Sequence, residues 1–363
     1  MADGYVIKET PEDFVVREDL ALDLHETGAY GIFLLQKRGV STPQAVAHLA
    51  KVNSLQQRAI GYAGNKDARA VTEQHISVKG RAKLRCEDER ITVSHLGFAD
   101  EPITLGSNKG NRFTITVRNV AAAVHVADEF MFPNYFGEQR FVGNNREIGL
   151  AILQRRFGDA AVLAGATRGR DERAGQETRD EEAGLAAGAD GREGAAGSAS
   201  SAVTNGDGLR YLQSLPKRRL RMYVHAYQSG IFNALLAEKV RRIASDAVVA
   251  ADGLAYPSGG VQFDDVEQTL PLPGFGLVYG PVIQALAADG LDERSFVIRQ
   301  MPGISEEGVE RRAFCLAKDV SVIAAVDETD PGTWVLRMEF WLPKGSYATV
   351  AIAAMMAIGE KSA

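Results

Sequence analysis

A long stretch near the middle of the chain, residues 165–208, consists almost entirely of glycine, alanine, serine and charged residues. Such a segment buries too little apolar surface to offset the entropy that it would lose on ordering, so we expect a flexible insert. It contains nine acidic and five basic residues, so most of the chain's net charge of −6 lies in a segment expected to contact nothing. The folded parts must therefore be built from the residues before and after it.

The composition of the chain favours a globular protein and gives no support to several common classes. With 363 residues, 45% of them hydrophobic, the chain can form one large domain or two ordinary ones. Cys86 and Cys315 lie far apart, which fits a reduced, cytoplasmic protein and argues against a zinc or iron–sulfur site. We see neither a signal peptide nor a membrane-spanning stretch, and we expect a monomer that does not bind membranes.

The spacing of apolar residues predicts both strands and helices, without a regular alternation of the two. Apolar and polar residues alternate at 113–118 and 334–342, which is typical of strands. Residues 41–52 and 227–244 have the apolar spacing of helices. This mixture favours an α+β fold with a mostly antiparallel sheet. The usual nucleotide-binding, zinc-protease and serine-hydrolase motifs are absent from the sequence, so we expect no nucleotide cofactor and no metal.

One loop, "GYAGNKD" (61–67), presents a candidate catalytic carboxylate. Asp67 follows Lys66 directly, and a nearby cation favours the ionised form that a nucleophile or general base needs. The alternative is an aspartate that caps its own turn, which is the commoner fate of this residue in such loops.

Other stretches have the chemistry needed to bind RNA. In residues 132–145 aromatic side chains surround Gly137, with Asn134 and Arg140 between them. An exposed ring can stack on a base while an amide reads its edge, although these aromatic residues could equally fill a core. Basic side chains that could contact phosphates, or could simply form a solvated face, are Lys109, Arg112, Lys217, Arg218, Arg219 and Arg221.

Taken together, six short stretches resemble the TruD family of transfer-RNA pseudouridine synthases. They are "KETPEDFVV" (8–16), "GNKDARAVTEQ" (64–74), "KGNRFT" (109–114), "PNYFGEQRF" (133–141), "YQSGIFN" (227–233) and "WLPKGSYAT" (341–349). They occur in the family's order, and the match is thinner between about 245 and 310. Two departures are Val142, at a position where the family usually has glycine, and Ala353-Ala354, where it tends to have an Arg-Glu pair.

The resemblance implies a pseudouridine-synthase catalytic core with a mostly antiparallel mixed sheet, interrupted by an inserted TruD-specific α/β domain. The expected catalytic domain comprises residues 1–157 and 315–363, and the expected insert comprises 158–314.

The resemblance also implies an isomerase that acts on transfer RNA without a cofactor or metal. Such enzymes detach uracil from its ribose, rotate it and rejoin it through C5, and the family's substrate is the uridine at position 13. The implied site consists of Asp67 as catalytic residue, Lys8 as its cationic partner, and Phe14, Asn134, Phe136 and Tyr347 as substrate-binding residues. Whether Asp67 acts as a nucleophile or as a base is left open. Two alternatives are a non-catalytic RNA-binding or RNA-folding module on the same fold, and a hydrolase that releases free uracil.

Overall fold

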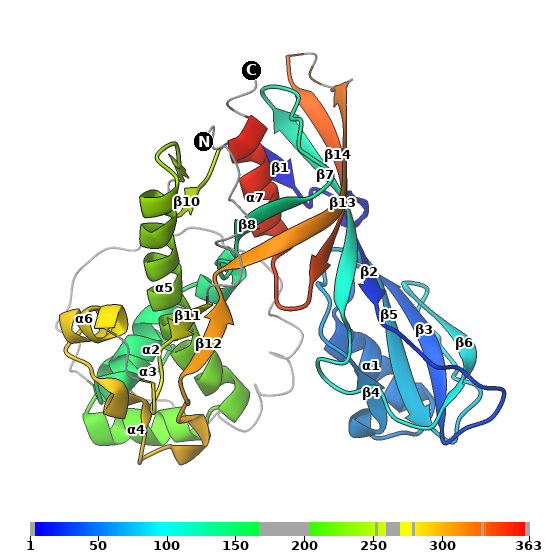
Figure 1. Cartoon of the computed structure of the whole chain (residues 1–363). Coiled ribbons are helices and arrows are strands. Elements are labelled where there is room, and N and C mark those ends of the chain that lie inside the picture. Colours follow the sequence, from blue (N-terminus) through cyan, green and yellow to red (C-terminus); the bar gives the residue numbers. More distant parts are fainter. Residues whose placement is uncertain are drawn as a thin grey trace. The chain divides into compact units, whose positions relative to one another are not determined.

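The structure is a computed structural model that describes residues 4–166, 203–250, 253–258, 269–277, 280–327, 330 and 332–359. The chain divides into two compact units, and Figure 1 shows the elements of both. The first unit comprises Met1–Pro133, Ala244–Asp265 and Phe314–Ala363, and the second comprises Asn134–Ile243 and Val266–Ala313.

A large sheet forms the framework of the first unit. In the described residues it has ten strands, and its main path runs β6-β3-β5-β2-β7-β14-β13-β8, while β1 pairs with β7 and β4 pairs with β5. These strands are β1 (Val6–Ile7), β2 (Phe14–Asp19), β3 (Tyr30–Arg38), β4 (Ile60–Tyr62), β5 (Val71–Lys79), β6 (Ile91–Ala99), β7 (Gly110–Val120), β8 (Phe130–Pro133), β13 (Phe314–Val326) and β14 (Trp334–Pro343). Among the described strand pairs of this sheet, only β2–β5 is parallel, so the expected α+β fold with a mostly antiparallel sheet is confirmed.

The alternating patterns seen in the sequence correspond to the centre of this sheet. Strands β7 and β14 pair antiparallel, with Phe113 opposite Phe340, and the two rings stack 5.5 Å apart between centroids. Both side chains are buried, as are their apolar neighbours two residues away along each strand. Helix α7 (Ala348–Gly359) follows β14 after a short turn.

Helix α1 (Thr42–Val52) covers the part of the sheet from which the loop of Asp67 emerges. Ser41 caps the helix by accepting a hydrogen bond from the backbone N–H of Gln44, and Pro43 lies in the first turn. One face of α1 buries Val46 and Leu49 in a core that it shares with β3 and β5. The sheet and this helix together give the loop a rigid base.

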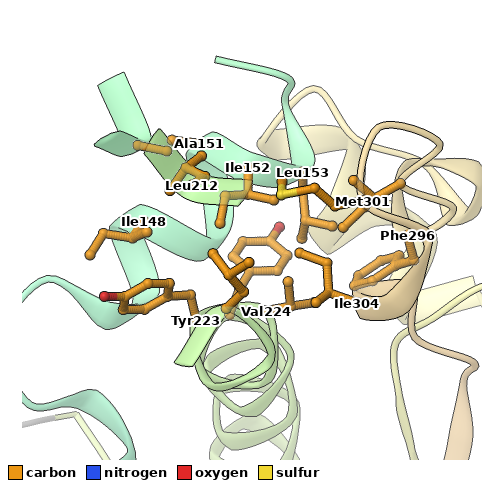
Figure 2. Close-up of a cluster of buried hydrophobic side chains, with 14 of the residues drawn as sticks. Ile148, Ala151, Ile152, Leu153, Leu212, Tyr223, Val224, Phe296, Met301 and Ile304 are labelled. Carbon is orange, nitrogen blue, oxygen red and sulfur yellow. The ribbon is translucent and has the colours of Figure 1, made fainter. Parts of the chain in front are cut away.

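The second unit is mainly helical. Its helices are α2 (Asn145–Leu153), α3 (Phe157–Leu163), α4 (Asn205–Ser214), α5 (Lys217–Ile243) and α6 (Gly280–Ala288), and its strands β11 (Thr269–Leu272) and β12 (Val309–Arg312) pair antiparallel. Figure 2 shows its core, in which Ile148 and Ile152 of α2 lie beside Tyr223 and Val224 of α5. The short strands β9 (Val248–Val249) and β10 (Ala255–Tyr256) pair with each other in the first unit. In the described part of the chain, no helix is long and apolar enough to cross a membrane.

The division between the units differs from the boundary expected at residue 157. The second unit begins at Asn134, because α2 buries Ile148 and Ile152 in the core of that unit. The first unit in turn regains residues 244–265 before the chain returns to it at Phe314.

The expected flexible insert ends earlier than residue 208. Helix α4 starts at Asn205, and Thr204 caps it by accepting a hydrogen bond from the N–H of Asp207. A Cβ atom at Gly208 would lie 2.3 Å from the carbonyl oxygen of Phe157, so glycine is needed there for close packing rather than for flexibility. Residues 167–202, which make up most of the stretch, lie outside the described residues.

Candidate active site

The carboxylate of Asp67 lies against the ammonium of Lys8. Asp67 is in the loop between β4 and β5, and Lys8 directly follows β1. Its Nζ donates a hydrogen bond to Asp67 Oδ2 at 2.5 Å. The two side chains are 21% and 30% exposed for Lys8 and Asp67, so both can be reached from solvent. The pairing of Lys8, rather than the adjacent Lys66, with Asp67 agrees with the sequence-based expectation.

An unusual backbone conformation and a short turn position Lys8. Its φ is +61°, a left-handed conformation that costs a non-glycine residue roughly 1–2 kcal/mol. The following 3₁₀ turn, Pro11–Asp13, is closed by Asp13, whose Oδ2 accepts a hydrogen bond from the N–H of Thr10. Arg118 of β7 donates to the other carboxylate oxygen of Asp13 at 2.8 Å. The turn is therefore tied to the central sheet, and this holds Lys8 in place.

Phe14 lies directly beneath Lys8. The Lys8 Nζ is 4.0 Å from the centroid of the Phe14 ring, a distance at which cation and ring attract each other. The ring is only 3% exposed and also makes an edge contact with Phe113. In this structure Phe14 supports Lys8, and its contact with substrate stays a prediction.

A buried lysine clamps the backbone of the loop that carries Asp67. Lys37 of β3 is 2% exposed, and its Nζ donates to the carbonyl oxygens of Val40 at 2.6 Å and Asp67 at 3.0 Å. The carbonyl oxygen of Lys66 is a third, longer acceptor at 3.4 Å. Burial lowers the pKa of Lys37 from 10.5 to about 8, although the nearby Asp67 carboxylate opposes this shift.

Two neutral side chains hold the same loop from the other side. The hydroxyl of Thr42 accepts a hydrogen bond from the backbone N–H of Lys66 at 2.8 Å and donates to Gln74 Oε1 at 2.7 Å. The Nε2 of Gln74 then donates to the carbonyl oxygen of Gly64 at 3.2 Å. The loop is thus bonded to α1, β3 and β5, and a loop so held presents Asp67 in one position.

The side chain of Lys66 is directed to a buried ion pair. Its Nζ donates to Glu18 Oε1 at 2.7 Å, and Glu18 Oε2 accepts from the backbone N–H of His75 at 2.9 Å. Burial alone would raise the pKa of Glu18. The hydrogen bonds from His75 and the charge of Lys66 outweigh burial and hold that pKa below its usual range. Glu18 therefore neutralises the charge of Lys66, and the ammonium that hydrogen-bonds to the Asp67 carboxylate is that of Lys8.

Asn134 and Phe136 belong to the second unit, where Arg311 of β12 contacts both. The Arg311 guanidinium carbon lies 4.1 Å from the centroid of the Phe136 ring, and Nη2 donates to Asn134 Oδ1 at 2.7 Å. Asn233 of α5 pairs with the backbone of Phe136 through two hydrogen bonds of 2.9 Å. The Nδ2 of Asn134 donates to the carbonyl oxygen of Arg312 at 3.0 Å. Both residues are buried, and their contact with a base stays a prediction.

The predicted residues Tyr347, Lys109 and Arg112 belong to the first unit. Tyr347 is partly buried at the start of α7, and Lys109 is exposed just before β7. Arg112 pairs with Asp319 at 2.7 Å, so its charge is partly compensated.

The basic cluster of Lys217, Arg218, Arg219 and Arg221 lies in the first turns of α5, in the second unit, because this helix begins ten residues before the helical pattern expected at 227–244. Two of these side chains have partners within the unit. Arg219 donates to the hydroxyl of Tyr223 and Arg221 to Glu306, both at 2.8 Å.

The structure also shows how exposed the residues at the two departures from the family pattern are. Val142 is 64% exposed and follows a 3₁₀ turn, Glu138–Phe141. Ala353 and Ala354 are buried in α7, where a charged pair would have to lose its hydration.

Sequence reasoning did not identify Lys37, Glu18, Thr42, Gln74 or Arg311. One signal for Lys37 was present, since it follows Phe33 and Leu35 at a spacing of two and therefore occupies an inward position of β3. A lysine in such a position needs buried acceptors. No comparable local pattern singles out Arg311.

Comparison with known proteins gives the chain its context. The family model described as "tRNA pseudouridine synthase D (TruD)" matches residues 3–272 and 265–354. Proteins named tRNA pseudouridine synthase D from Geobacter sp. (strain M21) and Aquifex aeolicus are 32% and 30% identical to the chain, over 97% and 98% of its length and 96% and 99% of theirs. A crystal structure of a TruD protein from Methanosarcina mazei is similar, with a TM-score of 0.63, 25% identity, and coverage of 99% of this chain and 95% of the other.

Proposed function

Since the chain belongs to the TruD family of tRNA pseudouridine synthases, we propose that it isomerises the uridine at position 13 of transfer RNA and that Asp67 is its catalytic residue. The observation that carries this proposal is the Asp67–Lys8 pair, a reachable carboxylate 2.5 Å from a cation. The loop beneath it is fixed by hydrogen bonds from Lys37. A carboxylate held in this way has the preorganisation that catalysis needs.

The proposed reaction moves one bond and one proton. The bond between C1′ of the ribose and N1 of uracil breaks, the base rotates, and C5 bonds to C1′. C5 then loses its proton, and N1 ends with one, so the product is an isomer of the substrate. Asp67 acts either by attacking C1′ or by removing the proton at C2′.

The ammonium of Lys8 has two tasks in this proposal. It orients Asp67 through the 2.5 Å hydrogen bond, and its positive charge favours the negative charge that develops while the glycosidic bond is broken. The roles of Asn134, Phe136, Phe14 and Tyr347 in holding the base are predictions from the family resemblance. Extracting the uridine from a helix costs a few kcal/mol.

The test is Asp67→Asn, which keeps the shape of the side chain and removes its charge. Turnover on a transfer RNA transcript should fall by at least about 1,000-fold, the scale expected for the loss of a nucleophile or base. The dissociation constant for transfer RNA should stay within a few-fold. The matched control is Asp88→Asn, since Asp88 pairs with Arg90 elsewhere in the same unit. Pseudouridine is read by carbodiimide treatment and primer extension.

Four outcomes would contradict parts of the proposal. Activity of Asp67→Asn close to that of the wild type would remove Asp67 as the catalytic residue. Pseudouridine formation in a transcript with cytidine at position 13 would contradict the proposed position. Tight binding of transfer RNA by the wild type without any modification would favour the non-catalytic RNA-binding module, and release of free uracil would favour a hydrolase.

A further inference from the structure

A cavity of about 460 Å³ lies beside the loop of Asp67, within the first unit. Three segments line this open cavity. They are residues 63–66 before β5, residues 106–111 before and at the start of β7, and residues 344–346 between β14 and α7. Hydrogen bonds connect these segments. Gly106 N–H donates to the carbonyl oxygen of Ala63 at 2.8 Å, and Lys344 N–H donates to that of Lys109 at 3.0 Å. The cavity is therefore built by residues far apart in the sequence.

The lining of the cavity favours a ligand that is anionic and rich in hydrogen-bonding groups. The residues that line it include Asn65, Asn108, Asn111, Ser346 and two lysines, and the described residues that line it include no carboxylate. Lys66 is neutralised by Glu18. Lys344 is exposed, donates to the neutral carbonyl oxygen of Gly106 at 2.8 Å, and makes no ion pair with the described residues. Its charge is available to an anion.

Two further features point to a ligand that approaches closely. A Cβ atom at Gly64 or Gly106 would meet nothing within 4 Å, so open space lies beside both residues, and the φ of +83° at Gly106 favours glycine. Asn111 lines the cavity, and its buried Oδ1 has no hydrogen-bond partner among the described residues. A buried acceptor without a partner costs roughly 1–3 kcal/mol, which a ligand hydroxyl would relieve.

We propose that this cavity binds the phosphate and ribose of one nucleotide next to the target uridine, with Lys344 contacting the phosphate and Asn111 accepting a hydrogen bond from the ribose 2′-hydroxyl. The inference rests on the proposed function, because it takes the RNA to be the substrate of Asp67. Lys66, which lines the cavity, directly precedes Asp67 in the chain. A nucleotide bound in the cavity would therefore be a near neighbour, along the RNA, of the uridine that reacts at Asp67. The volume is within the range of about 300–1,000 Å³ that is usual for ligand pockets.

The first test is Lys344→Gln in the full chain, a change that removes the charge and keeps a hydrogen-bond donor for Gly106. Binding of transfer RNA is measured by filter binding over a range of KCl concentrations. Loss of one phosphate contact should reduce the slope of log K against log[salt] by about 0.7–0.9. The matched control, Lys79→Gln, changes an exposed lysine at the end of β5 that does not line the cavity and should leave the slope as in the wild type.

The second test addresses the ribose. Transcripts with a single 2′-deoxy nucleotide at position 12 or 14 are compared for wild type and Asn111→Ala. One of these deoxy substitutions should weaken binding by wild type several-fold and should have no further effect on Asn111→Ala.

An unchanged salt slope for Lys344→Gln, with normal modification of transfer RNA by the wild type, would overturn this inference and leave the proposed function standing. Equal effects of the deoxy substitution on wild type and Asn111→Ala would overturn the ribose contact. Failure of the wild type to modify transfer RNA would instead remove the proposed function, and the cavity's role with it.

Discussion

Replacing Lys37 by methionine tests whether the buried clamp sets both the stability of the first unit and the position of Asp67. The substitution keeps much of the side-chain volume and removes the donor to the carbonyl oxygens of Val40, Lys66 and Asp67. It also removes a buried charge. These two effects oppose each other at neutral pH, so the dependence on pH is the sharper observable.

The size of the pH effect follows from the pKa of Lys37, which is lowered from 10.5 to about 8 by burial. Between pH 8 and 10.5 the folded protein releases this proton while the unfolded chain still binds it, and stability rises wherever the unfolded state binds more protons. Each pKa unit corresponds to about 1.36 kcal/mol. From pH 7 to pH 9, wild type should therefore gain about 1.4 kcal/mol relative to Lys37→Met.

The chain provides a convenient probe for this measurement. Its two tryptophans, Trp334 and Trp341, both lie in β14 of the first unit, so tryptophan fluorescence in urea reports unfolding of the unit that contains Lys37. The matched control is Thr42→Val, which removes the acceptor of the Lys66 N–H without removing a titratable group. Its free energy of unfolding should be lowered equally at pH 7 and pH 9.

The Lys37→Met variant should also form pseudouridine more slowly than wild type. A displacement of a catalytic group by about 1 Å can cost about 100-fold in rate, so Lys37→Met should form pseudouridine roughly 10- to 100-fold more slowly than wild type at pH 7. If the stability difference between wild type and Lys37→Met is the same at pH 7 and pH 9, the burial argument is wrong. A wild-type rate would show that the clamp does not position Asp67.

Two further predictions concern Lys8 and Arg311. Lys8→Met should lower the rate of single-turnover pseudouridine formation by about 100- to 1,000-fold and leave the affinity for transfer RNA within a few-fold. The reason is that the ammonium 2.5 Å from Asp67 acts on the charge that develops in the reaction. An unchanged rate would assign the cationic role to another residue. Arg311→Met should weaken local structure by about 1–3 kcal/mol, since it loses both the stacking on Phe136 and the hydrogen bond to Asn134. Amide hydrogen exchange of the peptide that contains Asn134 and Phe136 should accelerate, less so in Arg311→Lys, and unchanged exchange would refute this role.

Much of the fold was predictable because its signals are local. The alternation at 334–342 predicted β14, and the apolar spacing at 41–52 predicted α1, since both depend only on neighbouring residues. The domain boundary expected at residue 157 stays a prediction. The two compact units divide at Asn134, and α2 is assigned to the second unit by its packing on α5, a contact that no local pattern shows.

The candidate site was predictable in part. The family motifs pointed to Asp67 and Lys8, and the structure brings these two side chains together. The same motifs could not reveal that Arg311 stacks on Phe136, because Arg311 is separated from it by most of the second unit's sequence. The end of the flexible insert was also misjudged, since the glycine at 208 is required by close packing that the sequence does not display.

The sequence by itself determined the family and the α+β class, and it predicted the candidate catalytic carboxylate, because motifs and apolar periods are properties of short segments. Tertiary structure decided what surrounds that carboxylate. The pairing of β3 with β5 sets Lys37 opposite Thr72 and so brings its ammonium to the carbonyl oxygens at the Asp67 loop. The parallel alignment of β2 with β5 brings Glu18 to Lys66. Strand register depends on the whole sheet at once, and no single segment of the chain encodes it.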